Sequence, residues 1–210
     1  MKVTLKVLLT AAVILLVYMC YASLYVSIKF DDEKLIRERA IRDRLIDIRK
    51  AQIEYKNIHK EHAANFDVLA KFLNEEKLPF LIKEGVLTDE QLELGMTEQE
   101  AVKKGLIKRD TFWVTAKDTL FAKDFVAEDL RHVPGTNVQF SMDTATITSS
   151  SGYVVKVFEA GVRFDDYLGD LDKQLLFNLN EVANKQNKYA GLRVGSLTEI
   201  NNNAGNWENL

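Results

Sequence analysis

Residues 7–28 read VLLTAAVILLVYMCYASLYVSI, and this stretch decides how the rest of the chain is organised. It carries no charged side chain, and at about 1.5 Å per residue a helix of this length crosses the roughly 30 Å hydrocarbon core of a bilayer. Tyr18, Tyr21 and Tyr25 lie toward its distal end, where aromatic side chains anchor helices at the membrane interface. The stretch predicts a retained transmembrane helix that follows a short tail over residues 1–6.

The same stretch has an alternative interpretation as a cleaved signal peptide. Lys2 and Lys6 form a basic start, and the residues from Cys20 to Ala22 are an acceptable small-residue cleavage site. The apolar run continues to Ile28, well beyond the point at which a cleaved peptide would end. This extra length favours the membrane anchor, while cleavage stays open.

Two arguments about the orientation of the anchor lead to opposite conclusions. Basic residues are more numerous on the carboxyl side, which by the positive-inside rule places the large domain in the cytoplasm. Long domains translocate largely regardless of charge, and a short basic start before an apolar run is the usual exporting layout. We expect a single-pass protein of the inner (plasma) membrane with its carboxyl-terminal domain outside the cytoplasm. The lipid bilayer is therefore the first partner that the sequence implies.

Composition limits what the remainder of the chain can be. The 210 residues are 47% hydrophobic and 28% charged, which suits one globular domain with its own core. The single cysteine excludes a disulfide framework and any site made of several thiolates. The net charge of −3, with arginines interleaved with acidic residues, argues against a nucleic-acid partner.

A helical stalk or hairpin is predicted over residues 29–78. Residues 32–62 contain no glycine or proline, and one helix face carries residues at alternating spacings of four and three. That face comprises Ile41, Leu45, Ile48, Gln52, Tyr55, His59 and His62. It needs a partner, which is either the protein's own domain or another chain, and a coiled coil is one form of the second alternative. Glu38 and Arg42 are read as an i,i+4 pair on a solvated face.

A second helix with the sequence FDVLAKFLNEE is predicted to begin after Asn65 as its cap, and Pro79 is expected to end the helical pair. Two short units follow, at residues 88–95 and 97–105. Each opens with a capping box, Thr97 with Glu100 in the second, and each closes at a glycine. Short helices or ordered loop at the edge of the domain are the expected structure.

An α+β globular domain is predicted over residues 79–200. Residues 111–116 and the stretch after the turn at Lys117 and Asp118 suggest a hairpin, and residues 137–148 and 153–158 suggest a second one around the turn at 149–152. A small antiparallel sheet of three to five strands accounts for this pattern. A covering helix is predicted after Asp170 as its N-cap, and GLRVGSL is a candidate last strand. Residues 201–210 form a polar carboxyl-terminal tail, a loop or frayed end in which Trp207 either folds back or contacts a partner.

Catalytic and metal-binding patterns do not emerge from the sequence. His59 and His62 lack a third ligand at a recognisable spacing, and the acidic group at 165–172 does not match a calcium loop. Ser149 to Ser151 are explained better as a turn, and His132 has no evident nucleophile beside it. We therefore predict a protein that is not an enzyme and has no cofactor, metal site or catalytic residues. An enzyme with an unrecognised site stays as a minor alternative.

The layout resembles that of type IV pilins and pseudopilins. The shared features are a short basic start, one apolar helix that continues into an amphipathic one, and a small antiparallel sheet; the segment IRKAQIEYKNIHKEHAANFDVLAKFL at 48–73 is similar to their helix-to-loop passage. The chain departs from the family in lacking a glycine–phenylalanine processing site and a glutamate five residues into the apolar run. No functional residue is carried over from the family.

These observations predict a non-enzymatic, single-pass envelope protein that acts as a structural, assembly or interaction subunit. Its expected partners are other envelope proteins or further copies of itself. The interface hypothesis names Ile41, Leu45, Ile48, Tyr55 and Trp207. The alternative is a membrane-tethered ligand-binding or sensory domain with a pocket between the sheet and its covering helix.

Overall fold

The computed structural model describes residues 2–84, 95, 97, 100, 103–104, 106, 108–149 and 151–208. The fold is α+β, as predicted, with a long amino-terminal helix followed by small antiparallel sheets and short helices. The chain forms two compact units, one made of Met1–Phe66 with Glu128–Leu210 and the other of Asp67–Ala127. The segment boundaries at 6, 28, 78 and 200 stay a prediction.

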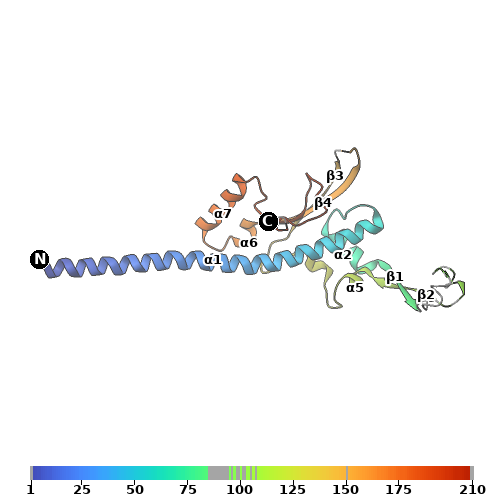
Figure 1. The fold of residues 1–210 in the computed structure, drawn as a ribbon, viewed down its shortest axis with the longest axis horizontal. Coiled ribbons are helices and arrows are strands. Elements are labelled where there is room, and N and C mark those ends of the chain that lie inside the picture. The colour runs from blue at the N-terminus through green and yellow to red at the C-terminus, as the bar shows by residue number, and fades with distance from the viewer. Residues whose placement is uncertain are drawn as a thin grey trace. The chain divides into compact units, whose positions relative to one another are not determined.

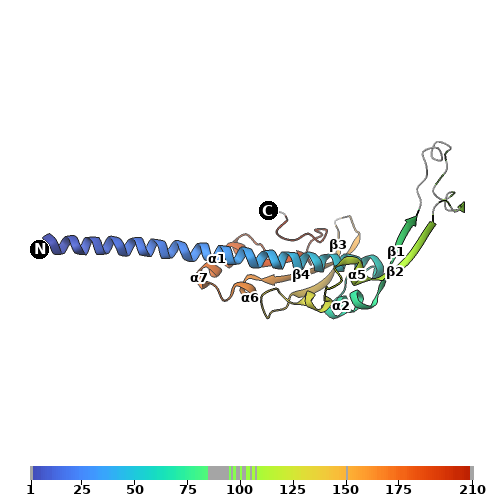
Figure 2. The same ribbon diagram turned by 90° about the horizontal axis from the view of Figure 1, so that it is seen from below.

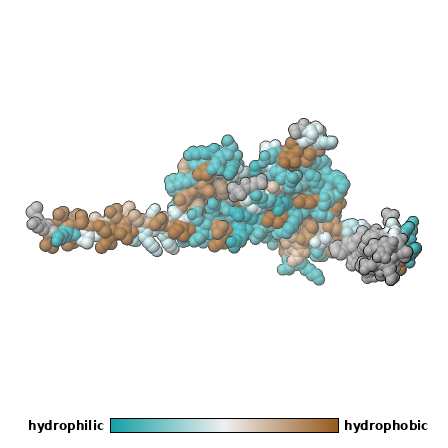
Figure 3. All heavy atoms as spheres, in the orientation of Figure 1, coloured by the Kyte–Doolittle hydropathy of each residue, from teal (hydrophilic) through white to brown (hydrophobic). Residues whose placement is uncertain are grey.

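Helix α1 (Lys2–His59) runs without a break from the apolar segment into the first unit (Figure 1). Neither glycine nor proline occurs in it, so no residue interrupts the backbone hydrogen bonds. It ends where Lys60 adopts a left-handed conformation with φ of 62°. Its apolar first part is long enough to span a membrane by length and composition, and none of it is buried in the protein (Figure 3).

A three-stranded sheet lies alongside the second part of α1. Its strands β3 (Ser141–Thr148), β4 (Val154–Arg163) and β5 (Gly191–Gly195) are antiparallel in the order β3-β4-β5. Helix α1 contacts both β4 and β5, and the two ribbon views agree on this arrangement (Figures 1 and 2). Between β3 and β4 the chain turns as predicted, with the Ser149 amide donating to the Tyr153 carbonyl at 2.8 Å.

The core of the first unit combines one face of α1 with the inner residues of the sheet. On α1, four residues of the predicted face have no exposed surface: Ile41, Leu45, Ile48 and Gln52. Further core residues come from the strands, from the 3-10 helix η1 (Ala127–Arg131), from the segment between η1 and β3, and from the two helices after β4. They are Leu130, Val133, Phe140, Val157, Phe158, Ala160, Val162, Tyr167, Leu168, Leu176, Leu192 and Val194.

Helices α6 (Phe164–Leu168) and α7 (Lys173–Lys185) connect β4 to β5. The N-cap of α7 is Asp172, whose carboxylate accepts from the amides of Gln174 and Leu175, so the prediction of Asp170 as the cap was wrong. Asp170 instead forms a two-pronged ion pair with Arg37 of α1, at 2.5 and 2.8 Å. The guanidinium lowers the pKa of the Asp170 carboxyl and the carboxylate raises the pKa of Arg37, chiefly through these hydrogen bonds.

The second unit contains α2 (Phe66–Glu75) and a two-stranded antiparallel sheet of β1 (Lys77–Glu84) and β2 (Lys108–Thr115). Pro79 lies within β1 opposite Trp113 and does not end the helical pair, since α2 already ends at Glu75. The predicted hairpin turn at Lys117 and Asp118 was also wrong. Both residues lie in helix α5 (Ala116–Leu120), which Thr115 caps by accepting from the Asp118 amide.

Part of the predicted capping-box region falls on described residues. Thr97 and Glu100 exchange both hydrogen bonds of the predicted box, each at 3.3 Å. Gly95 has φ of 72°, the left-handed conformation expected of a glycine that closes a helical turn. The first box, at 88–91, and Gly105 lie outside the described residues.

Candidate functional site

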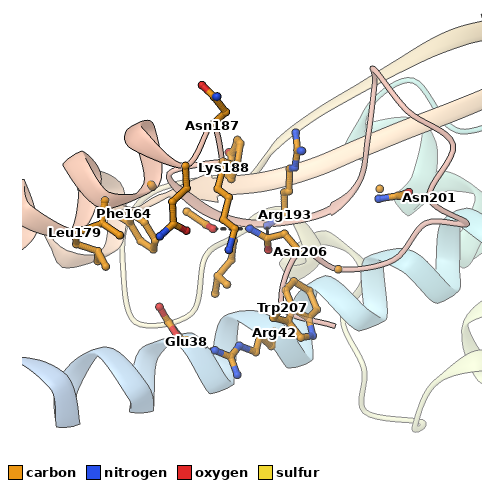
Figure 4. Close-up of a pocket in the computed structure, with 18 of the residues that line it drawn as sticks. Glu38, Arg42, Phe164, Leu179, Asn187, Lys188, Arg193, Asn201, Asn206 and Trp207 are labelled. Carbon is orange, nitrogen blue, oxygen red and sulfur yellow. Dashed lines mark hydrogen bonds and ion pairs between the residues drawn. The ribbon is translucent and has the colours of Figure 1, made fainter. Parts of the chain in front are cut away.

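A pocket of about 550 Å³ lies in the first unit between α1, α7, β5 and the carboxyl-terminal segment (Figure 4). We call it the C-terminal pocket. Its lining residues are Lys34, Glu38, Arg42, Phe164, Leu179, Val182, Ala183, Gln186, Asn187, Lys188, Tyr189, Gly191, Leu192, Arg193, Gly195, Glu199, Asn201, Gly205, Asn206 and Trp207. A volume of this size is within the range of small-molecule sites.

Helix α1 contributes three charged side chains to the pocket, each one turn from the next. Glu38 accepts from the Tyr167 hydroxyl at 3.2 Å and from Nη2 of Arg42 at 2.8 Å, and Nζ of Lys34 lies 3.9 Å from it. Glu38 is only 7% exposed, so the prediction of a solvated helix face was wrong at this residue. Burial and the nearby Glu38 carboxylate raise the pKa of Tyr167, which therefore stays a neutral hydrogen-bond donor.

The carboxyl-terminal segment forms another wall of the pocket because it is fastened along β5. The Gly195 amide donates to the Ala204 carbonyl at 3.1 Å, and the Asn206 amide donates to the Arg193 carbonyl at 3.0 Å. The Asn206 side chain accepts from the Arg193 amide at 3.1 Å and donates to the Gly191 carbonyl at 2.9 Å. The Asn206 side chain therefore takes the place of a neighbouring strand at the edge of β5.

Trp207 folds back onto the unit, which is one of the two alternatives that the sequence left open. A Cβ at Gly205 would lie 2.5 Å from its indole ring, so glycine is required beneath it. On α1, Arg49 pairs with Glu208 at 2.6 Å, which holds the segment further along. Residues 201–208 are consequently an ordered loop and not a frayed end.

The side of the pocket nearest β4 is closed by a paired arginine and a half-buried tyrosine. Arg193 forms an ion pair with Glu159 at 2.8 Å, and its guanidinium lies 5.2 Å from the centre of the Tyr189 ring. Burial, reinforced by Glu159, raises the pKa of Tyr189. Arg193 is therefore already paired, and its side chain and the Tyr189 ring form this wall of the pocket.

Arg42 differs from the other pocket arginine in having a donor without an acceptor. Its Nε is buried and makes no hydrogen bond to any described residue. Leaving a buried donor unpaired costs on the order of 1–3 kcal/mol, and more for a charged group.

The structure places the five predicted interface residues in different surroundings. Ile41, Leu45 and Ile48 have no exposed surface, so they belong to the intramolecular face and are not available to a partner. Tyr55 is half-buried with its ring 4.3 Å from that of His59, centre to centre. Trp207 lines the C-terminal pocket. The interface hypothesis stays a prediction for Tyr55 and Trp207.

His62 is the most unusual titratable group of the described residues. It is 6% exposed, its ring lies 4.8 Å from that of Phe158, and neither ring nitrogen has a hydrogen-bond partner of normal geometry in the described part of the chain. Burial, assisted by the charge of Lys56, lowers the pKa of His62 to about 4, and the backbone groups of Gln52 and Lys156 oppose this shift. His62 is therefore neutral at neutral pH.

The acidic group predicted to be a solvated loop and helix cap has a structural role at each residue. Asp165 accepts from Asn180 at 2.7 Å, and Asp166 accepts from the Arg163 amide at 3.2 Å. Asp170 binds Arg37, and Asp172 caps α7. Among the described residues, no three histidine, cysteine, aspartate or glutamate side chains are grouped so that they could hold a metal ion.

Sequence reasoning anticipated a pocket between sheet and covering helix but named none of its polar residues apart from the Glu38–Arg42 pair. Lys188, Arg193 and Asn206 come from three stretches without a recognisable motif. The one signal that was present is Trp207 in a polar segment, because an aromatic residue there usually has a contact to make.

Comparison with protein-family models, with curated proteins and with solved structures gives no match for this chain. The long amino-terminal apolar helix followed by a small sheet is compatible with a pilin-like layout. The same helix fits a single membrane anchor.

Proposed function

We propose that this chain is a non-enzymatic, single-pass envelope protein that acts as an interaction or assembly subunit. The observation that carries the proposal is the continuity of α1, whose apolar first part is uncovered and whose second part supplies the core of the folded unit. A stiff helix of this kind couples the membrane segment directly to the folded unit. A partner that binds the membrane segment therefore also positions the folded unit, and a partner that binds the folded unit positions the membrane segment.

The layout supports an assembly role of the pilin type, in which neighbouring copies or other envelope proteins associate through their amino-terminal helices. Beyond the apolar run, α1 still exposes Leu35 and Ile36, at 53% and 66%. These side chains lie outside the core face and within two turns of the membrane segment, where helices brought together in a bilayer would meet. We place the folded unit outside the cytoplasm at the inner membrane.

The make-up of the pocket lining supports a role other than catalysis. Its described part contains no serine, threonine, cysteine or histidine, and its buried carboxylate, Glu38, is held by Tyr167 and Arg42. The other carboxylate, Glu199, is exposed. The lining therefore holds no carboxylate that is both buried and free to act as a general base or nucleophile.

Site-specific photocrosslinking in living cells tests the assembly role. A photoreactive residue at Ile36 or Tyr55 should give discrete crosslinked adducts, either to a second copy or to another envelope protein. The same residue at Lys185, which is exposed on α7 away from this surface, is the matched control and should give none. A chain that stays monomeric in detergent and forms no adduct from Ile36 or Tyr55 would refute the assembly role.

The C-terminal pocket favours a second candidate function, a membrane-tethered ligand-binding or sensory domain. Its size and mixed polar and apolar lining are those of a small-molecule site, and it is built on the helix that leads to the membrane. A library of small molecules and cell-wall fragments should contain compounds that raise the thermal midpoint of the protein reproducibly. The absence of any such compound would argue against this second function.

A further inference from the structure

We propose that the C-terminal pocket binds a small molecule that carries an oxyanion, either a carboxylate or a phosphate, next to a compact apolar group. The inference deepens the second candidate function and rests on it. Three independent features of the pocket lead to it: the balance of charge, an unpaired buried donor and the apolar walls.

The charge balance of the lining favours an anion. Lys34, Arg42, Lys188 and Arg193 face two carboxylates, Glu38 and Glu199. Glu38 is engaged by Lys34, Arg42 and Tyr167, and Arg193 is engaged by Glu159 from outside the lining, so these groups together carry one positive charge more than they carry negative charges. Lys188 is exposed at the pocket rim, so it is free to turn toward a bound oxyanion.

Arg42 offers the anion a point of attachment. It lines the pocket, and its Nε is buried without an acceptor among the described residues, while Nη2 of the same guanidinium holds Glu38. Arginine is fully protonated at any working pH, so an oxygen acceptor at Nε would gain a charge-assisted hydrogen bond. Figure 4 shows Arg42 and Glu38 on α1, with Lys188 across the pocket.

The remaining walls suit an apolar group next to the oxyanion. Phe164, Leu179 and Val182 line one part of the pocket, and the Trp207 indole lines another. A free inorganic anion would leave these surfaces wet, whereas a ligand with an apolar part would bury them. Apolar burial contributes roughly 25 cal/mol per Å².

The position of the pocket along α1 bears on the source of the ligand. Arg42 follows Ile28, the end of the uncharged apolar run, by 14 positions, which is about 21 Å at 1.5 Å per residue. The headgroup layer extends only about 5–8 Å beyond the hydrocarbon core. A soluble anion reaches Arg42 directly, whereas a lipid headgroup would have to leave the bilayer surface to do so.

The test uses the full chain in a neutral detergent and takes Trp207 as the reporter. The protein has two tryptophans, and Trp113 is 64% exposed on β2, so Trp113→Phe leaves Trp207 as the only tryptophan signal. The probes are octanoate, its neutral analogue octanamide, and inorganic phosphate. A saturable change in Trp207 fluorescence is expected with octanoate, and binding of octanamide should be at least about tenfold weaker.

Pocket variants tie the binding to the proposed atoms. Arg42→Lys keeps the charge and the ion pair with Glu38 but removes Nε, and it should weaken octanoate binding about tenfold. Lys188→Gln should weaken it severalfold, whereas Lys185→Gln, which removes an exposed lysine from the same helix end outside the pocket, should have no effect. Thermal midpoints of all variants verify that each one is folded.

The source is assigned with nanodiscs of phosphatidylcholine, prepared with and without phosphatidylglycerol. A Trp207 response to octanoate in both membranes identifies a soluble ligand. An Arg42-dependent response to phosphatidylglycerol alone identifies a lipid headgroup as the oxyanion. No saturable response to any anion, or equal binding of octanoate and octanamide, would overturn the proposal. If library compounds without an anionic group stabilise the protein independently of Arg42, ligand binding stands and the oxyanion class alone fails.

Discussion

Two buried polar side chains decide local structure at the end of α1. Gln52 lies on the predicted helix face, whereas the prediction was wrong for His62, because α1 ends at His59. Gln52 has no exposed surface, and its amide donates to the Ala63 carbonyl and accepts from the Ala63 amide, each at 2.9 Å. This pair of hydrogen bonds replaces the strand or helix partner that the turning backbone lacks. His62, one residue earlier than Ala63, is enclosed by the same turn.

Replacing Gln52 by alanine should destabilise the first unit by about 2–4 kcal/mol, because both backbone groups of Ala63 would be left buried and unpaired. Chemical denaturation of the full chain in neutral detergent measures the change. Gln174→Ala is the matched control, since Gln174 is exposed on α7 and its side chain donates to Asn178, one turn further along the same helix. The control should change stability by less than about 0.5 kcal/mol. Equal effects of the two substitutions would contradict this account of Gln52.

The buried neutral His62 predicts a loss of stability in acid. Its pKa is lowered to about 4 in the folded state, whereas the unfolded chain titrates near the ordinary value of 6.5. Above pH 6.5 both states are neutral and stability is complete. As the pH falls from 6.5 toward 4 the unfolded chain takes up a proton that the folded chain resists, and about 3 kcal/mol is lost.

Denaturation midpoints at pH 7.0, 5.5 and 4.5 test this expectation. His62→Phe keeps an aromatic ring against Phe158 and removes the titration, so most of the pH dependence in this window should disappear. The pKa of Asp170 is lowered by Arg37, so the stability that this pair contributes is complete above the ordinary carboxyl pKa of 3.8. It is lost only as the pH falls below that value, so Asp170 does not contribute to the pH dependence between 7.0 and 4.5. An unchanged pH dependence in the variant would rule out His62 as the cause.

At the scale of elements, α1 shows the distinction between a core face and an exposed face most clearly. Leu45 has no exposed surface, while Leu35 on the same helix is 53% exposed. Leu45→Ala should cost about 2–5 kcal/mol, because it removes buried methyl groups and leaves a cavity. Leu35→Ala should cost less than about 0.5 kcal/mol and should reduce association if the proposed assembly surface is correct.

Urea denaturation measures stability and the yield of crosslinked product measures association, so the two measurements together separate these roles. Leu35→Ala should lower the crosslinking yield and leave stability unchanged, whereas Leu45→Ala should lower stability. A Leu45→Ala variant of unchanged stability would mean that the core does not depend on this face of α1.

Elements whose partners are local were predicted with good accuracy. The turn at 149–152 and the last strand at Gly191–Gly195 follow from turn residues and short apolar runs, and the Thr97–Glu100 box follows from its own spacing. Errors arose where a distant residue or a competing local cap intervened. Arg37 recruits Asp170 across more than a hundred residues, which leaves Asp172 to cap α7. Thr115 caps a helix at Lys117 and Asp118 although that dipeptide is typical of a turn.

At the scale of the whole molecule, the open question is on which side of the membrane the folded unit lies. We expect a cysteine at Ser151, in the exposed β3–β4 turn and in a Cys20→Ser background, to be labelled by a membrane-impermeant maleimide in cells with a permeable outer barrier. A cysteine at Thr4, before the apolar run, should be labelled only after lysis. The opposite pattern would place the unit in the cytoplasm and would confirm the orientation that the positive-inside rule gives for this chain.

The sequence by itself determined the membrane-spanning length of residues 7–28, the continuity of the helix beyond it, the buried face at Ile41, Leu45 and Ile48, and the α+β class. These depend on composition and on short-range periodicity, which are properties of neighbouring residues. Only the tertiary structure decided that this face is intramolecular, that Glu38 is buried beneath Tyr167, and that Arg42, Lys188 and Trp207 surround one pocket. The physical reason is that burial and charge pairing depend on which distant segments meet, and local pattern carries no information about that meeting.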